Sequence, residues 1–269
     1  MNSHKGFGAE WNDRPQQHYL IEPRYLAGAG DLRHATEFLR ASGWKEQSKT
    51  GGPIVFHNPA KSVRVVFDPL TQPGDWTIEG KASGHQPAWA AKFGIRTPVE
   101  IIAGLTDTLT QPPTAHAPNV WVPLDAQNWN TRQGQHFTAM SPDRSAFVQF
   151  HQSSPGQAHW WIGARTEHGR AWDAELSPTT PLSLVQAVTT ALADPQPVMR
   201  PRGAFPPSSR IRTTSVSVRP SELGAWQQAR INAARTAAWA RSAWATARPR
   251  GRKPAAAPRV PAGYATGRR

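Results

Sequence analysis

The chain of 269 residues has no cysteine, and this absence removes several classes of site. Without thiols there is no disulfide framework, no thiolate zinc site and no cysteine nucleophile. Long apolar runs are missing as well, since no stretch approaches the ~20 residues that a helix needs to cross a bilayer. The N-terminal stretch is polar and lacks the apolar core of a signal peptide, so the sequence predicts a cytoplasmic protein without a transmembrane segment.

Recognisable catalytic motifs are also missing from the sequence. There is no Gly-x-x-x-x-Gly-Lys, His-Glu-x-x-His or Gly-x-Ser-x-Gly pattern, and no His/Asp/Glu cluster with metal-ligand spacing recurs along the chain. We therefore assign no catalytic residue, no metal ligand and no cofactor. Whether the protein is an enzyme stays open, although the sequence favours a protein that is not one.

Positive charge is concentrated at the C-terminal end of the chain. Residues 200–269 hold fifteen Arg or Lys and one acid, whereas residues 1–199 hold sixteen Arg or Lys and seventeen acids. The C-terminal part is thus a strong cation on a nearly neutral protein. A flexible cationic segment attracts phosphate-rich polymers, and such binding falls steeply as the salt concentration rises.

The most informative feature that is present is an internal repeat. His-Gln-Pro-Ala-Trp at 85–89 recurs as His-Gly-Arg-Ala-Trp at 168–172. The shift that carries position 85 onto position 168, here called the repeat shift, gives thirteen identities without a gap when it is applied to residues 59–109. Self-similarity at a fixed spacing indicates a duplicated structural unit.

Both copies show the same order of local patterns. In the first copy a helix is expected between Asp31 and Gly43, then four short strands between 53 and 93, then a second helix. That helix follows Thr97-Pro98-Val99-Glu100, which has the form of a capping box. The sequence therefore predicts the α+β fold class, with two tandem repeats of helix, four-stranded antiparallel sheet and helix, followed by a mostly disordered basic C-terminal tail with one Ala-rich helix.

Composition divides the chain into seven segments. Proline-rich stretches separate the two copies from each other and from the tail, and an Ala-rich segment with good helix propensity follows Ser221. The expected division is a disordered N-terminus at 1–18, a first domain at 19–110, a linker at 111–119, a second domain at 120–194, a second linker at 195–220, an Ala/Trp/Arg helix at 221–248 and a disordered basic tail at 249–269.

The two copies share one ionisable position, the histidine of the turn before the Trp-containing strand. His85 and His168 are therefore candidate ligand-binding residues, because histidine titrates near neutral pH. The alternative, which the sequence favours, is that both are ordinary turn residues, since no common acid or base surrounds them. Trp89 and Trp172 are expected in the core. Trp161 must point to the face opposite its neighbour Trp160 and is the third candidate for an exposed contact.

The Ala-rich helix and the tail supply the candidates for nucleic-acid contact. Trp226 and Arg230 are four residues apart, as are Trp244 and Arg248, so each pair can stack on its partner or on bases. One alternative is that this helix lies on an anionic membrane surface, and another is that it docks on the folded part or is a solvated linker. The nucleic-acid candidates are Arg230, Arg241, Arg248, Arg250, Arg252 and Lys253.

The order of these motifs is similar to that of a known family. Ser141-Pro142-Asp143, followed by an apolar strand, a Trp strand, a Trp-x-Ala strand and a Thr-Pro helix start, resembles the SPDY domain family, domain of unknown function 317, which is abundant in actinobacteria of the streptomycete type. Arg144 stands where the family has tyrosine, and residues 58–61 of the first copy depart further. Pro23 to Gly28 resembles the family's opening. The resemblance implies tandem SPDY domains over about residues 20–193 and brings no catalytic residue with it.

Three functions are compatible with these patterns. The leading hypothesis is a non-catalytic binding or adaptor protein, whose domains engage an unknown protein partner and whose residues 200–269 add affinity for nucleic acid. The second is a small-ligand-binding or enzymatic domain with a site near the His85 or His168 turn. The third is a purely structural tandem domain with an inert tail.

Overall fold

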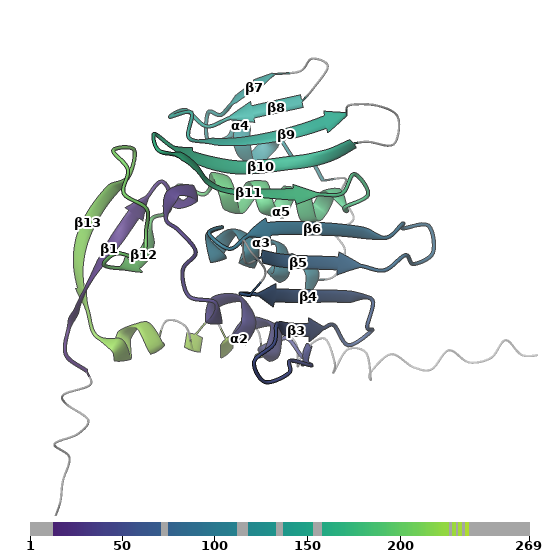
Figure 1. Cartoon of the computed structure of the whole chain (residues 1–269), viewed down its shortest axis with the longest axis horizontal. Helices are drawn as coiled ribbons and strands as arrows, with labels where there is room; N and C mark the ends of the chain where they lie inside the picture. Colours follow the sequence, from purple (N-terminus) through teal and green to yellow (C-terminus); the bar gives the residue numbers. More distant parts are fainter. Residues whose placement is uncertain are drawn as a thin grey trace, which may run out of the picture.

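A ten-stranded antiparallel sheet dominates the structure, with helices on one of its faces and a three-stranded sheet beside it (Figure 1). This computed structural model describes residues 13–70, 75–111, 118–132, 137–152, 158–225, 228, 229, 231, 232, 235 and 236. The expected α+β class, with a separate four-stranded sheet in each copy, is wrong. The described chain is mostly β, because both copies contribute five strands each to one continuous sheet.

The two copies follow the same order of elements along the chain. The first contains η1 (Arg24–Leu26), α2 (Arg33–Ala41), β2 (Lys45–Glu46), β3 (Ile54–His57), β4 (Val63–Asp68), β5 (Asp75–Gly80), β6 (Trp89–Gly94) and α3 (Val99–Leu109). The second contains α4 (Val122–Asp125), β7 (Asn130–Arg132), β8 (Phe137–Met140), β9 (Ala146–Gln152), β10 (Ala158–Thr166), β11 (Gly169–Leu176) and α5 (Leu182–Ala193). The order in the sheet is β2-β3-β4-β5-β6-β11-β10-β9-β8-β7.

Strands β6 and β11 join the two copies at the middle of the large sheet. Lys92 pairs with Glu175, and the flanking pairs join residue 91 to 176 and residue 93 to 174. The repeat shift carries Lys92 onto Glu175, so these two paired residues are counterparts. It also carries residue 91 onto 174 and residue 93 onto 176, so the two flanking pairs are counterparts of each other. The two copies are therefore related by a local twofold axis between Lys92 and Glu175, as in the isologous interface of a homodimer.

The helices repeat this symmetry behind the sheet, where α3 packs against α5. A Cβ atom added at Gly104 would lie 2.7 Å from the Cβ atom of Ala191 and 3.0 Å from the carbonyl oxygen of Ala187. Gly104 and Ala187 are also counterparts under the repeat shift. The two helices therefore approach most closely near the axis, where only small side chains leave room for both backbones.

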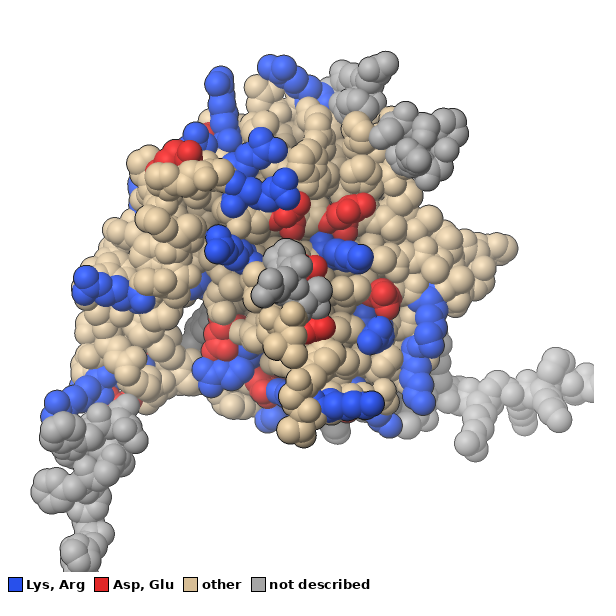
Figure 2. Space-filling view, viewed as in Figure 1, with Lys and Arg blue, Asp and Glu red and all other residues tan. Residues whose placement is uncertain are grey.

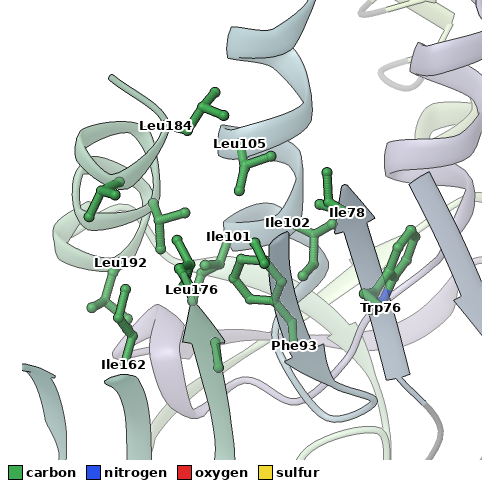
Figure 3. Packing of buried hydrophobic residues seen from close by; sticks show 14 of the residues in the cluster. Trp76, Ile78, Phe93, Ile101, Ile102, Leu105, Ile162, Leu176, Leu184 and Leu192 are labelled. Atoms are coloured by element: carbon green, nitrogen blue, oxygen red, sulfur yellow. The ribbon is translucent and has the colours of Figure 1, made fainter. Parts of the chain in front are cut away.

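One hydrophobic core fills the space between the sheet and the helices of both copies (Figure 3). Alternate residues of each strand point into it, as in the burial pattern of β5. Trp89 and Trp172 are buried as the sequence predicts, and the indole nitrogen of Trp172 donates a 2.7 Å hydrogen bond to the carbonyl oxygen of Tyr25. The side chains labelled in Figure 3 are Trp76, Ile78, Phe93, Ile101, Ile102, Leu105, Ile162, Leu176, Leu184 and Leu192.

The small sheet brings together two parts of the chain that are far apart in sequence. β1 (Gln16–Glu22) lies in its middle, between β12 (Val198–Pro201) and β13 (Arg212–Val218). Residues 195–220 were expected to be a proline-rich linker, and residues 16–18 to belong to a disordered N-terminus. Both segments are instead ordered by pairing with each other, which local composition does not reveal.

A buried ion pair connects the small sheet to α3. The guanidinium of Arg200 donates to both carboxylate oxygens of Glu100, at 2.8 and 2.6 Å, and its Nε donates to the carbonyl oxygen of Ala27 at 3.1 Å. Burial would raise the pKa of Glu100, but its hydrogen bonds to Arg200 hold that pKa below the ordinary value. The expected capping box is therefore wrong: α3 begins after Pro98 without a side-chain cap, and Glu100 binds Arg200 instead.

We expect Trp172→Ala to lower the free energy of unfolding by about 3–5 kcal/mol, because it empties a large core volume and leaves the Tyr25 carbonyl without its donor. Urea unfolding followed by circular dichroism measures the loss. Thr77→Ala, which removes a half-buried side chain from the other face of the sheet, is the control and should cost much less. A loss under about 1 kcal/mol for Trp172→Ala would contradict its place in the core.

Candidate binding face of the second copy

The helices cover only one face of the large sheet, and the opposite face, here called the outer face, is turned toward the viewer in Figure 2. Over the seam and the first copy this face is a mixture of acids and bases. Arg64 lies 3.5 Å from Glu79 in an exposed ion pair, and Lys92 is opposite Glu175. In Figure 2, basic side chains lie over the upper strands of the second copy, and acidic side chains appear among them toward the seam, where β11 carries Asp173 and Glu175.

Strands β9 and β10 place a different set of side chains on the outer face. The rings of Phe147 and Trp161 meet edge to face, with centroids 4.9 Å apart. The guanidinium carbon of Arg165 lies 5.3 Å from the Phe147 centroid and 5.9 Å from that of Trp161. Beside them the His151 and His159 rings lie 5.5 Å apart. We call these five residues the aromatic face.

A glycine makes room for the aromatic ring at the edge of this cluster. Gly163 lies directly opposite Phe147 in the pairing of β9 with β10. A Cβ atom added at Gly163 would lie 3.0 Å from Cζ of Phe147 and 2.8 Å from the carbonyl oxygen of Trp172. Because the position carries no side chain, the Phe147 ring can lie over the backbone of β10 and reach Trp161.

The first copy provides an internal comparison, since its β4 and β5 pair in the same way as β9 and β10. Strand β10 is offset by one position from the repeat shift, so that Trp160 is the structural counterpart of Trp76. On the outer face, three cross-strand pairs of the first copy have counterparts in the second. Asp68–Asp75 corresponds to His151–His159, Val66–Thr77 to Gln149–Trp161, and Arg64–Glu79 to Phe147–Gly163. The fold itself therefore does not require rings at these positions.

Acidic residues shape the electrostatics of the first copy's outer face. Burial raises the pKa of Asp75; nearby Lys92 lowers it, and Asp173 across the seam raises it further. The counterpart of Asp75 is His159, which carries no negative charge. The outer faces of β9 and β10 therefore carry no acid and one base, Arg165, whereas those of β4 and β5 carry three acids and one base. The acids of the second copy's outer face lie on β11, where Asp173 is opposite Gly163 and Glu175 is opposite Trp161.

The Ser141–Asp143 turn has a structural role that connects it to the start of the first copy. Asp143 Oδ1 accepts hydrogen bonds from the Tyr25 hydroxyl at 2.8 Å, from Ser141 Oγ at 2.6 Å and from the backbone N–H of Ser145 at 3.1 Å. Burial raises the pKa of Tyr25, and the carboxylate of Asp143 adds to this shift. Burial alone would raise the pKa of Asp143, but these hydrogen bonds hold it below its ordinary value.

The corresponding turn of the first copy keeps the same backbone geometry with different residues. Asn58 stands in place of Ser141, and its Oδ1 accepts from the N–H of Val63 at 3.0 Å, as Ser141 Oγ accepts from that of Ala146 at 2.8 Å. The fourth turn position has a positive φ in both copies, 53° at Lys61 and 58° at Arg144. The fourth position of this turn is thus a left-handed one in both copies.

His85 and His168 do not come together in the structure. Both are exposed, and they lie in hairpins before β6 and β11, which run antiparallel, so the hairpins are at opposite ends of the sheet. His168 Nε2 is 3.8 Å from Glu167 Oε1, and His168 borders a hollow of about 550 Å³. No group of three or more potential metal ligands occurs in the part of the chain that the structure describes. The role of His85 and His168 in ligand binding stays a prediction.

The nucleic-acid candidates of the C-terminal segment, Arg230, Arg241, Arg248, Arg250, Arg252 and Lys253, all lie outside the described residues, as do Trp226 and Trp244. The described part of that segment, which includes residues 220–225, is helical. Within it the side chain of Ile231 is buried, with only 8% exposed. The contacts of the basic residues stay a prediction.

A large hollow separates the small sheet from the outward faces of α3 and α5, and Figure 2 shows an opening at this place. It has a volume of about 1420 Å³ and is bordered by small residues of both helices, such as Ala103 and Ala187. The Arg200–Glu100 pair lies in its wall, and every nitrogen of that guanidinium already donates a hydrogen bond within the protein. The pair therefore has little capacity left for a ligand.

Sequence reasoning placed Trp161 on the correct face of its strand but missed the rest of the aromatic face. The missed residues are Phe147, Arg165, His151 and His159. Phe147 was hidden because it stands next to the core residue Val148, so that the strand looks continuously apolar. The histidines are outward residues in strict alternation with core residues, a signal that becomes readable once β9 and β10 are paired.

Comparison with known proteins identifies one family. Residues 57–115 and residues 140–198 each match SPDY, described as a domain of unknown function (DUF317). The two matched segments have the same length and are related by the repeat shift, in agreement with the internal repeat. No curated protein and no solved structure is detectably similar to the chain. Among the described residues, no helix combines the length and apolar character needed to cross a membrane.

We expect Asp143→Ala to destabilise the protein by about 1–3 kcal/mol at neutral pH, because it strips the Tyr25 hydroxyl and Ser141 of their acceptor. The folded state lowers the pKa of Asp143, so its charge contributes stability above the unfolded-state pKa. That contribution is lost as the pH falls through the folded-state pKa. Urea unfolding at neutral and acidic pH should therefore show a difference between wild type and variant that shrinks in acid. Equal stability at neutral pH would show that the turn does not fasten Tyr25.

Proposed function

Because the chain contains two tandem SPDY domains, whose family function is unknown, we propose that it is a non-catalytic nucleic-acid-binding protein of the adaptor kind. The outer face of the second copy holds single-stranded nucleic acid through its aromatic face. The basic C-terminal segment adds contacts to phosphates. The domains' protein partner stays a prediction, as does the cytoplasmic location.

The arrangement of rings and charge on β9 and β10 supports this function. A solvent-facing sheet with aromatic side chains is a platform on which unpaired bases stack, since every base has a π-face. Phe147 and Trp161 are half-buried, so their positions are fixed while part of each ring stays accessible. Arg165 lies over both rings and brings a cation to the place where a base and its phosphate would meet.

The single observation that carries the proposal is the contrast between the two copies. They share backbone, pairing and core, yet the four outer-face positions that hold rings in the second copy hold Arg64, Asp68, Asp75 and Thr77 in the first. Packing cannot explain the rings, because the same scaffold is built without them. A surface requirement of the second copy explains them. The outer faces of β9 and β10 carry rings and Arg165 but no acid, which fits a polyanion made of flat bases, and Glu175 of β11 borders this surface beside Trp161.

The C-terminal segment supports the same partner by a different physical effect. Its charge supplies affinity that does not depend on sequence and that decreases with salt, whereas stacking on Trp161 depends much less on salt. Residues 237–269 carry eight Arg or Lys and no acid. The two contributions can therefore be separated by experiment.

We expect Trp161→Ala and Phe147→Ala each to weaken binding of a labelled single-stranded DNA of mixed sequence by roughly 5- to 150-fold, the loss of about 1–3 kcal/mol of stacking. Fluorescence anisotropy at fixed salt measures the dissociation constant. Thr77→Ala and Arg64→Ala are the matched controls, since they change the counterpart positions of the first copy, and their affinity should change little. Equal losses in both copies, or no loss in the second, would contradict a site on this face.

Removing residues 237–269 should make binding less sensitive to salt, by at most about 0.7 in the log–log slope for each cation that meets a phosphate. This truncation retains β13 and Ile231, whereas ending the chain at residue 199 would remove a strand of the small sheet. The comparison is an anisotropy titration of full-length and truncated protein between low and moderate salt. Identical slopes would exclude the C-terminal segment from the interaction without affecting the result for Trp161→Ala.

A further inference from the structure

Two histidines face each other across neighbouring strands on the outer face of the second copy. His151 of β9 and His159 of β10 are a directly opposed pair in the antiparallel ladder. Their ring centroids are 5.5 Å apart, the ring planes are inclined by 56°, and both side chains are half-buried. The backbone of both strands is fixed by the sheet, so the separation of the two rings is set in advance.

The separation of the rings matches that of two imidazoles on one metal ion. A zinc–nitrogen bond of about 2.0–2.1 Å puts each ring centre roughly 3.2 Å from the metal, and a tetrahedral angle then places the two centres roughly 5.2 Å apart. The observed value differs from this by only a few tenths of an ångström. Rotation of either side chain about its own bonds accommodates such a difference without moving the sheet.

We propose that His151 and His159 bind a divalent transition-metal ion of the zinc type through one ring nitrogen each. Imidazole is a ligand that zinc, copper and nickel share, whereas magnesium and calcium prefer oxygen. Water completes the coordination sphere on the solvent side. The first copy argues against a purely structural role for the two rings, since the same ladder position there holds Asp68 and Asp75.

The place of this site on the aromatic face gives the metal a function. His159 is two residues from Trp161, and both point to the outer face. A metal whose outer positions carry water can exchange one water for a phosphate oxygen of a strand stacked on Trp161. This second step rests on the proposed function, whereas the metal site itself does not.

The metal site is tested by isothermal titration of the full-length protein with Zn²⁺ in a buffer that does not bind zinc. We expect one ion per chain, and an affinity at least about tenfold lower for His151→Ala and for His159→Ala, since each variant removes one of two protein ligands. His85→Ala, which removes an exposed histidine of the first copy, is the matched control and should bind like wild type. Near-ultraviolet circular dichroism establishes that each variant is folded.

The outcomes separate the two parts of the inference. Unchanged zinc affinity in folded His151→Ala and His159→Ala, or equal loss in His85→Ala, would overturn the site. If the site is present, Zn²⁺ should tighten single-stranded DNA binding of wild type but not of His151→Ala, as measured by anisotropy. Zinc binding without any effect on DNA affinity would overturn the phosphate step alone. Absence of DNA binding with and without zinc would reject the proposed function. The isothermal titration with Zn²⁺ would then still confirm or overturn the metal site by itself.

Discussion

The pairing of β6 with β11 is the constraint on which the rest of the structure depends. It joins two five-stranded halves into one sheet and, with the contact of α3 and α5, closes one core over both copies. Without it, each half would end in an open strand edge beside an apolar layer, which is a template for aggregation. The symmetric register around Lys92 and Glu175 removes both edges at once and leaves only the short β2 and β7 at the margins.

Several longer-range contacts secure the joined halves and make the tandem a single body. Tyr25, at the start of the first copy, reaches the Asp143 turn of the second and accepts a hydrogen bond from Trp172 through its carbonyl oxygen. Arg200, which follows the second copy, binds Glu100 at the start of α3 in the first. Each copy is thus completed by a segment next to the other, and the termini of the folded part meet in the small sheet.

The repeat, the tandem SPDY organisation, the buried tryptophans and the outward direction of Trp161 were all predictable, because each depends on local sequence or on self-comparison. The fold class and the small sheet were not. The local sequence of β6 does not indicate that its free edge pairs with β11 of the other copy. In the same way, β12 and β13 form a sheet only by pairing with β1, which is remote in the sequence. Glu100 looked like a capping residue because its true partner, Arg200, is remote in the sequence. The aromatic face was visible only in part, since its rings belong to two strands.

The local twofold axis has a consequence for how such a protein can change. In a homodimer of a single SPDY domain, every substitution is made twice, so a new surface must be tolerated on both halves. Fusion of the halves into one chain ends that coupling while keeping the shared core. The outer face of the first copy can then keep ordinary charged residues while the outer face of the second copy acquires aromatic ones. Duplication here separates the residues that maintain the architecture from those that are open to selection for a task.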